Sequence, residues 1–205
     1  MPNNGAKNPK SRPCLGFLTV IEHPQDGLFG GYLALDFRGR PLEFRCTAPI
    51  KPNRAQQILY GSTLNHYLYG ELIGRTLLEG SKLPPLVVCT DLTSVLAVRD
   101  FVDMPVAVVE SQSTQQPTSK TSSTETSSST ADSSTKTWQV HASHEQETRL
   151  NHFHWGRNRL ATSADVELDQ QTVTERLAPL ADSFDLTEPF VRIREAIEEA
   201  RCAGG

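Results

Sequence analysis

Three apolar, β-forming stretches separated by polar turns predict three short strands in the first part of the chain, and in the third of them apolar and polar residues alternate. These strands are expected at residues 15–22, 30–37 and 42–47, and each is rich in residues that favour β-structure. Turn-forming residues at 23–27 and 38–41 separate them. Strands joined by such short turns pair side by side, so this part of the chain predicts an antiparallel meander.

A longer spacing of the apolar residues predicts helices in the next part of the chain. Asn53 can cap a helix that begins at Arg54. Residues 64–79 carry leucines four apart on a broad apolar face, which predicts a helix mostly covered by protein. Gly70 and Gly74 lie four apart in this helix, and we expect them to let it approach a sheet closely.

A second apolar run, at residues 86–90, predicts a central strand that is buried on both faces. Asp91 follows it and can cap a short helix reaching Val102, and residues 106–110 form the next apolar strand. Strand, helix and strand with such short connections imply a parallel pair. We therefore predict an α/β fold, with α+β as the alternative. Its mixed sheet has an antiparallel three-strand meander followed by a β-α-β unit, with helices packed on the sheet.

Composition divides the chain into ordered and low-complexity parts. Residues 1–13 are polar and are expected to form a disordered tail. Residues 111–137 consist mainly of serine and threonine, which bury too little apolar surface to fold, so we expect a disordered insertion. Residues 14–110 and 138–205 are expected to form a single α/β domain, because the second segment holds too few large apolar side chains to fold alone.

Weaker patterns follow the Ser/Thr-rich tract. Alternation predicts strands or a hairpin at residues 138–142 and 150–155. Apolar residues at helical spacing predict a helix at 168–181, and Thr187-Glu188-Pro189 is a typical helix start for a last helix.

Bulk properties narrow the range of functions. A net charge of −4 and a pI near 5.9 argue against binding nucleic acid by overall charge. The four cysteines include no C-x-x-C pair, so neither a structural zinc site nor a disulfide framework is expected. No secretory signal and no apolar run of about 20 residues occurs, which predicts a soluble, cytoplasmic protein without a membrane partner.

Three dispersed acids give one candidate site. Glu22 ends the first expected strand, Glu71 lies in the long helix, and Asp91 ends the fourth strand. The element order over residues 15–110, β-β-β-α-β-α-β, resembles the ribonuclease H-like arrangement, which implies acids that bind two Mg²⁺ ions and cleave phosphodiesters. The chain departs from that pattern, because no aspartate lies inside the first strand. In the alternative interpretation, Glu22 and Glu71 are solvated acids and Asp91 is a helix cap.

Histidines give a second candidate site, for a transition metal. His141, His144, His152 and His154 lie within fourteen residues of one another. On a strand, His152 and His154 would point to the same face, which suits chelation of a metal ion. The alternative is that these histidines are ordinary residues of a polar strand face.

Two further features could serve a partner. Phe190, Ile193 and Ile197 form an apolar seam on the last helix, which either docks a partner or completes the protein's own core. Arg157 and Arg159 follow Trp155, a combination that can hold phosphate or stack on bases.

No sequence motif identifies a chemistry. The chain has no phosphate-binding loop, no dinucleotide fingerprint and no nucleophile elbow. We interpret it as a non-enzymatic interaction or scaffold protein that binds a protein partner; nucleic acid is not expected as a partner. The first alternative is a metal-dependent phosphodiesterase or nuclease, and the second is a transition-metal-binding protein. Both alternatives require the protein to bind a divalent metal ion. The main interpretation requires no cofactor.

Overall fold

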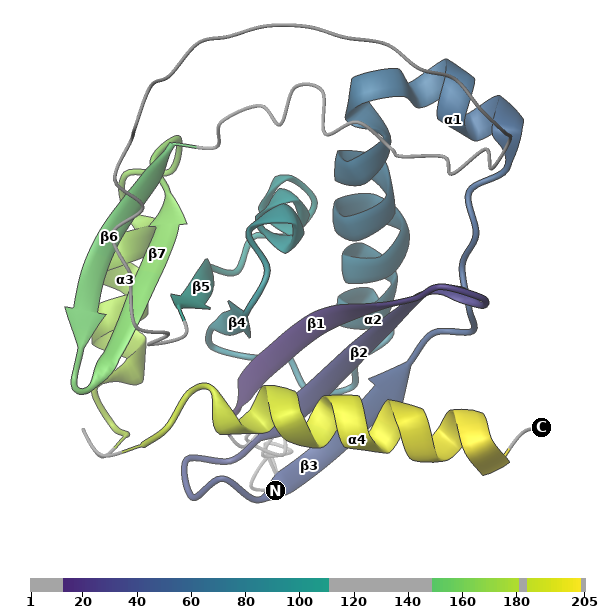
Figure 1. Ribbon diagram of the computed structural model, residues 1–205. Coiled ribbons are helices and arrows are strands. Elements are labelled where there is room, and N and C mark those ends of the chain that lie inside the picture. Colours follow the sequence, from purple (N-terminus) through teal and green to yellow (C-terminus); the bar gives the residue numbers. More distant parts are fainter. Residues whose placement is uncertain (1–12, 111–148, 181–183, 204–205) are drawn as a thin grey trace, which may run out of the picture.

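Seven strands form the sheet at the centre of the structure (Figure 1). The computed structural model describes residues 13–110, 149–180 and 184–203. The strands are β1 (Leu15–His23), β2 (Gly27–Leu35), β3 (Pro41–Cys46), β4 (Val88–Thr90), β5 (Val106–Glu110), β6 (Leu150–Trp155) and β7 (Asn158–Ser163). They are arranged in the order β3-β2-β1-β4-β5-β7-β6.

The sheet is mixed, and the predicted fold class is confirmed. Antiparallel pairing of β1 with β2 and of β2 with β3 forms the expected meander. β4 lies parallel to both β1 and β5, as the β-α-β pattern predicts. The β6–β7 hairpin adds to β5 in antiparallel orientation, so segments on both sides of residues 111–148 share the sheet. The expected disordered tract at 111–137 and strand at 138–142 lie outside the described residues.

Helical segments cover both faces of the sheet (Figure 1). One face, called here the α4 face, packs against α3 (Asp169–Leu177) and α4 (Glu188–Ala203). The other, called the η2 face, packs against the π-helix η2 (His66–Arg75), α2 (Thr76–Glu79) and the 3₁₀ helix η3 (Thr93–Asp100). The remaining helical segments are α1 (Arg54–Tyr60) and the 3₁₀ turn η1 (Gly61–Thr63). No helix in the described parts of the chain is long and apolar enough to cross a membrane.

Two adjacent glycines in β2 allow helices to approach from both sides. A Cβ atom at Gly30 would lie 2.3 Å from Cγ2 of Ile73 in η2. A Cβ atom at Gly31 would lie 2.3 Å from Cγ2 of Ile193 in α4. Neighbouring residues of a strand point to opposite faces, so one glycine serves each packed layer.

Two local expectations are corrected by the structure. Asp91 does not cap the following helix: η3 begins at Thr93, and no side chain caps it. Instead the hydroxyl of Thr90 accepts a hydrogen bond from the backbone N–H of Leu92 at 3.3 Å. Gly70 faces η3 rather than the sheet, because a Cβ there would meet backbone atoms of Ala97 at 2.9 Å.

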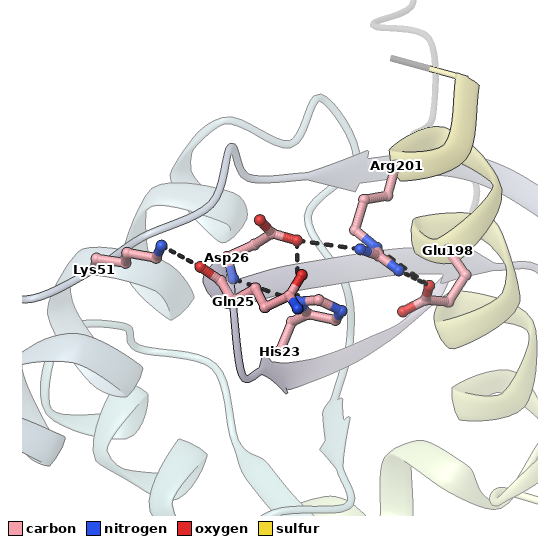
Figure 2. Close-up of polar contacts among 6 residues, drawn as sticks. All are labelled: His23, Gln25, Asp26, Lys51, Glu198 and Arg201. Carbon is pink, nitrogen blue, oxygen red and sulfur yellow. Dashed lines mark hydrogen bonds and ion pairs between the residues drawn. The ribbon is translucent and has the colours of Figure 1, made fainter. Parts of the chain in front are cut away.

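Polar contacts attach the end of α4 to the turn between β1 and β2 (Figure 2). Arg201 donates to Asp26 at 3.1 Å and to Glu198 at 2.9 Å. The same carboxylate of Asp26 lies 3.0 Å from Nδ1 of His23. Lys51 donates to a backbone carbonyl of this turn. Among these contacts, the one between Arg201 and Asp26 joins the C-terminal end of α4 to the meander.

Candidate functional site

Asp91 lies where β4 leaves the sheet, on the α4 face. One oxygen of its carboxylate pairs with the guanidinium of Arg194 in α4, and the side chain is only 12% exposed. The other oxygen, Oδ1, is buried and has no hydrogen-bond partner among the described residues. A small cavity of about 240 Å³ adjoins the pair and is lined by Asp91, Val109, Thr187, Phe190, Val191 and Arg194.

The other two candidate acids lie on the opposite face of the sheet. In the register of β1 and β4, Leu18 pairs with Thr90, and its side chain packs on the η2 face. Glu22 has the same parity along β1 as Leu18, so it shares that face. Burial raises the pKa of Tyr69 in η2, and the negative charge of Glu22 raises it further.

Glu71 belongs to η2 itself, so it too is separated from Asp91 by the sheet. Within the described residues, no three histidine, cysteine, aspartate or glutamate side chains form a group that could hold a metal ion. Glu22, Glu71 and Asp91 therefore do not fit the two-Mg²⁺ site that the ribonuclease H-like element order implies.

A second cavity adjoins the first at Thr187. It has a volume of about 380 Å³ and is lined by Glu110, Arg157, Asn158, Asp185 and Thr187. The Thr187 hydroxyl donates to Asp185 at 2.6 Å and Arg157 donates to the same carboxylate at 2.7 Å. These contacts lower the pKa of Asp185, and the hydrogen bond from the Thr187 hydroxyl has the largest effect. Arg157 and Asp185 are thus already paired with each other across this cavity.

Asn158, the first residue of β7, connects the β6–β7 hairpin to the residues just before α4. Its buried amide donates to the carbonyl of Phe184 at 2.8 Å and accepts from the N–H of Leu186 at 3.1 Å. Trp155, just before the turn, is buried in the core on the α4 face. It is therefore not available to stack on a base beside Arg157 and Arg159.

The β6–β7 hairpin places His152 and His154 on its exposed side. Nδ1 of His152 lies 3.0 Å from Oε1 of Glu110 at the end of β5. The other oxygen of Glu110 lies 2.5 Å from Nε of Arg159, which stands opposite His154 in the hairpin register. His141 and His144 lie outside the described residues.

The apolar seam of α4 is turned toward the protein's own interior. Phe190, Ile193 and Ile197 are buried on the α4 face of the sheet. The ring of Phe190 meets Phe17 of β1 edge to face, with centroids 5.7 Å apart. In this structure these three side chains offer no surface to a partner.

Exposed apolar side chains occur instead on α1, for which the sequence predicted only a helix capped by Asn53. Ile58 is 65% exposed and Leu59 is 82% exposed, and no residue of α1 is buried. Over residues 54–60 the only large aliphatic side chains are the neighbours Ile58 and Leu59. The sequence shows that these two residues are apolar, but their exposure depends on where the helix lies relative to the sheet.

Comparison with known proteins adds no functional assignment. No protein-family model matches the chain, and no curated protein matches it in sequence. The crystal structure of human ENDOV is similar over 52% of this chain and 48% of that chain, with a TM-score of 0.32 and 13% identity. The Marinitoga piezophila Argonaute in complex with 5′ OH guide RNA is similar over 50% of this chain and 16% of that chain, with a TM-score of 0.27 and 12% identity. This chain thus spans less than half of either structure.

Proposed function

We propose that this protein is a non-enzymatic interaction domain and that α1 docks into a protein partner. The observation that carries this proposal is the pair of adjacent aliphatic side chains, Ile58 and Leu59, exposed by 65% and 82% on a helix with no buried residue. Fully burying a side chain of this size stabilises by about 1.5–3 kcal/mol. Both side chains are available for burial in a partner.

Local contacts prepare α1 for binding. A seven-residue helix is too short to be stable by helix propensity alone. Here Asn53 accepts from the N–H of Gln56 at 2.8 Å, and the side chain of Gln56 accepts in return from the N–H of Asn53 at 2.9 Å. At the other end, the ring of Tyr60 stacks on Tyr67 with centroids 4.2 Å apart. A helix already held in shape loses less conformational entropy on binding.

Charge near α1 indicates the chemistry of the partner. Residues 48–60 include Lys51 and Arg54 and contain no acid. A short amphipathic helix usually binds by laying its apolar side chains into a groove. We therefore infer a partner protein with an apolar groove and an acidic rim, because opposite charges at the rim steer the encounter.

Site-specific photocrosslinking of the full chain tests this proposal. A photoreactive amino acid replaces Leu59 in one variant and Leu168, 70% exposed on the other half of the chain, in the control. The captured protein is identified, purified and titrated against wild type, I58S/L59S and the matched control L168S. We expect I58S/L59S to weaken binding by at least about thirtyfold, which corresponds to about 2 kcal/mol. L168S should bind like wild type.

Three results would overturn the proposal. One is capture of the same proteins from both positions, and another is equal affinity of I58S/L59S and wild type. The third is self-association of the purified chain that depends on Ile58 and Leu59, which would make α1 a contact between copies of this chain. Circular dichroism of I58S/L59S serves as the folding control, and because neither side chain is buried, we expect an unchanged spectrum.

A further inference from the structure

The β6–β7 hairpin holds two imidazoles on one exposed face. His152 and His154 alternate along β6 with Phe153 and Trp155, which are buried. Side chains two apart on a strand point the same way, and their Cα atoms are separated by about 6.6 Å. Two imidazoles at this spacing can turn their ring nitrogens toward one ion, which bonds histidine nitrogen at about 2.0–2.1 Å.

Glu110 sets the orientation of the first imidazole. Its Oε1 lies 3.0 Å from Nδ1 of His152, an ion-pair contact that favours a proton on Nδ1. A neutral imidazole that donates from Nδ1 carries its lone pair on Nε2. Histidines that bind metals commonly have a carboxylate or carbonyl at the other ring nitrogen, where it fixes the tautomer and makes the ligand more basic.

Arg159 fixes the role of that carboxylate. Its Nε lies 2.5 Å from Oε2 of Glu110, so the guanidinium pairs with one carboxylate oxygen while His152 lies beside the other. We therefore assign Glu110 the role of orienting His152. Its negative charge also offsets the positive charge of Arg159, which faces His154 across the hairpin.

We propose that His152 and His154 form an open binding site for a divalent transition metal ion, with Glu110 as the orienting carboxylate. Two nitrogen ligands select metals that favour imidazole, such as Cu²⁺, Ni²⁺ and Zn²⁺, over Mg²⁺ and Ca²⁺, which favour oxygen. No third histidine, cysteine, aspartate or glutamate completes the site among the described residues. Water or an external ligand fills the remaining positions. This site lies on β5, β6 and β7 and does not depend on the docking role of α1.

Metal titration of the full chain, purified without a histidine tag, tests the proposal. The probes are Cu²⁺ followed by electron paramagnetic resonance and Zn²⁺ followed by calorimetry. We expect H152A and H154A each to weaken the affinity of this site for Cu²⁺ by about tenfold or more, and E110Q by about tenfold. The matched control is H66A, because His66 also pairs with a carboxylate, Asp100 at 2.7 Å, but no other histidine lies within ten residues of it in the sequence. H66A should leave the affinity unchanged.

The tautomer of His152 gives an independent readout. Nitrogen-detected NMR of the metal-free protein should show the proton of His152 on Nδ1, and E110A should shift the population toward Nε2–H. All variants should keep the circular dichroism of wild type, because both histidines are exposed. Wild-type affinity in H152A/H154A, or absence of nitrogen coupling from the hairpin in the Cu²⁺ spectrum, would overturn the proposal.

Discussion

Arg99 and Asp169 form a two-point ion pair that joins η3 to the first residue of α3. Nε of Arg99 lies 2.8 Å from Oδ2 of Asp169, and Nη2 lies 3.2 Å from Oδ1. The Asp169 side chain is only 6% exposed. Arg99 also donates to the carbonyl of Val102 at 2.7 Å. This pair therefore connects η3, on the η2 face of the sheet, to α3, on the α4 face.

Removing the charge of Asp169 should destabilise the protein. D169N loses one charged acceptor and places an amide N–H against the guanidinium, so we expect the free energy of unfolding to fall by about 1.5–3 kcal/mol. Urea denaturation measures it. The control is E79Q, which breaks the exposed pair of Arg75 and Glu79 and should cost less than about 0.5 kcal/mol. A D169N protein as stable as E79Q would contradict the structural role of the pair.

Filling the gap at Gly31 should also destabilise the protein. The added methyl of G31A would overlap Ile193, so we expect a loss of about 1–3 kcal/mol in the free energy of unfolding. I193A alone should cost about 2–5 kcal/mol because it leaves a cavity. The double variant G31A/I193A should lose less than the two single losses together, since the new methyl enters that cavity. If urea denaturation shows that the loss in G31A/I193A equals the sum of the two single losses, Gly31 and Ile193 are not in contact.

Thiol reactivity should divide the four cysteines into two pairs. Cys46 and Cys202 are exposed, whereas Cys14 and Cys89 are buried. Burial raises the pKa of the Cys89 thiol to about 12, and it also raises the pKa of Cys14. Because the thiolate is the reactive form, a disulfide reagent should modify two thiols in the native protein and all four in denaturant. C46S/C202S should be almost unreactive when native, and rapid modification of a third thiol would contradict the described burial.

Acid should remove the stabilisation contributed by Asp185. Hydrogen bonds from Thr187, and then Arg157, lower the pKa of Asp185 from its ordinary value of 3.8. A carboxyl whose pKa is lower in the folded state contributes stability above its unfolded pKa, and this contribution is lost as the pH falls through the folded pKa. D185N should therefore be less stable than wild type at about pH 6, and the difference should shrink below about pH 4.

The matched variant for this prediction is T187V, which removes the hydroxyl and nearly preserves the shape. We expect T187V to raise the pKa of Asp185 toward its ordinary value, as measured by NMR titration of the carboxyl carbon. Denaturation of D185N, T187V and wild type across the acidic range then reports the stability. An unchanged difference between D185N and wild type at all pH values would show that the carboxylate charge contributes nothing.

Much of the fold was predictable because its signals are local. Richness in β-forming residues identified β1 almost to the residue, and alternation did the same for β3. The Asn53 cap and the start of α4 followed from side chains next to the backbone that they serve. The parallel pairing of β4 and β5 followed from connection length. The 3₁₀ form of η3 was not predicted, and Asp91, which was expected to cap it, instead pairs with Arg194 of the distant helix α4.

The candidate sites depended on relations that no local pattern carries. By itself, the sequence determined that Asp91 ends a strand, that His152 and His154 share a strand face, and that Phe190, Ile193 and Ile197 share a helix face. Only the tertiary structure decided that the sheet separates Asp91 from Glu22 and Glu71, that Glu110 reaches His152, and that Ile58 and Leu59 stay uncovered. The physical reason is that strand parity and helix periodicity act within a few residues, whereas partners are chosen by packing between segments far apart in the chain.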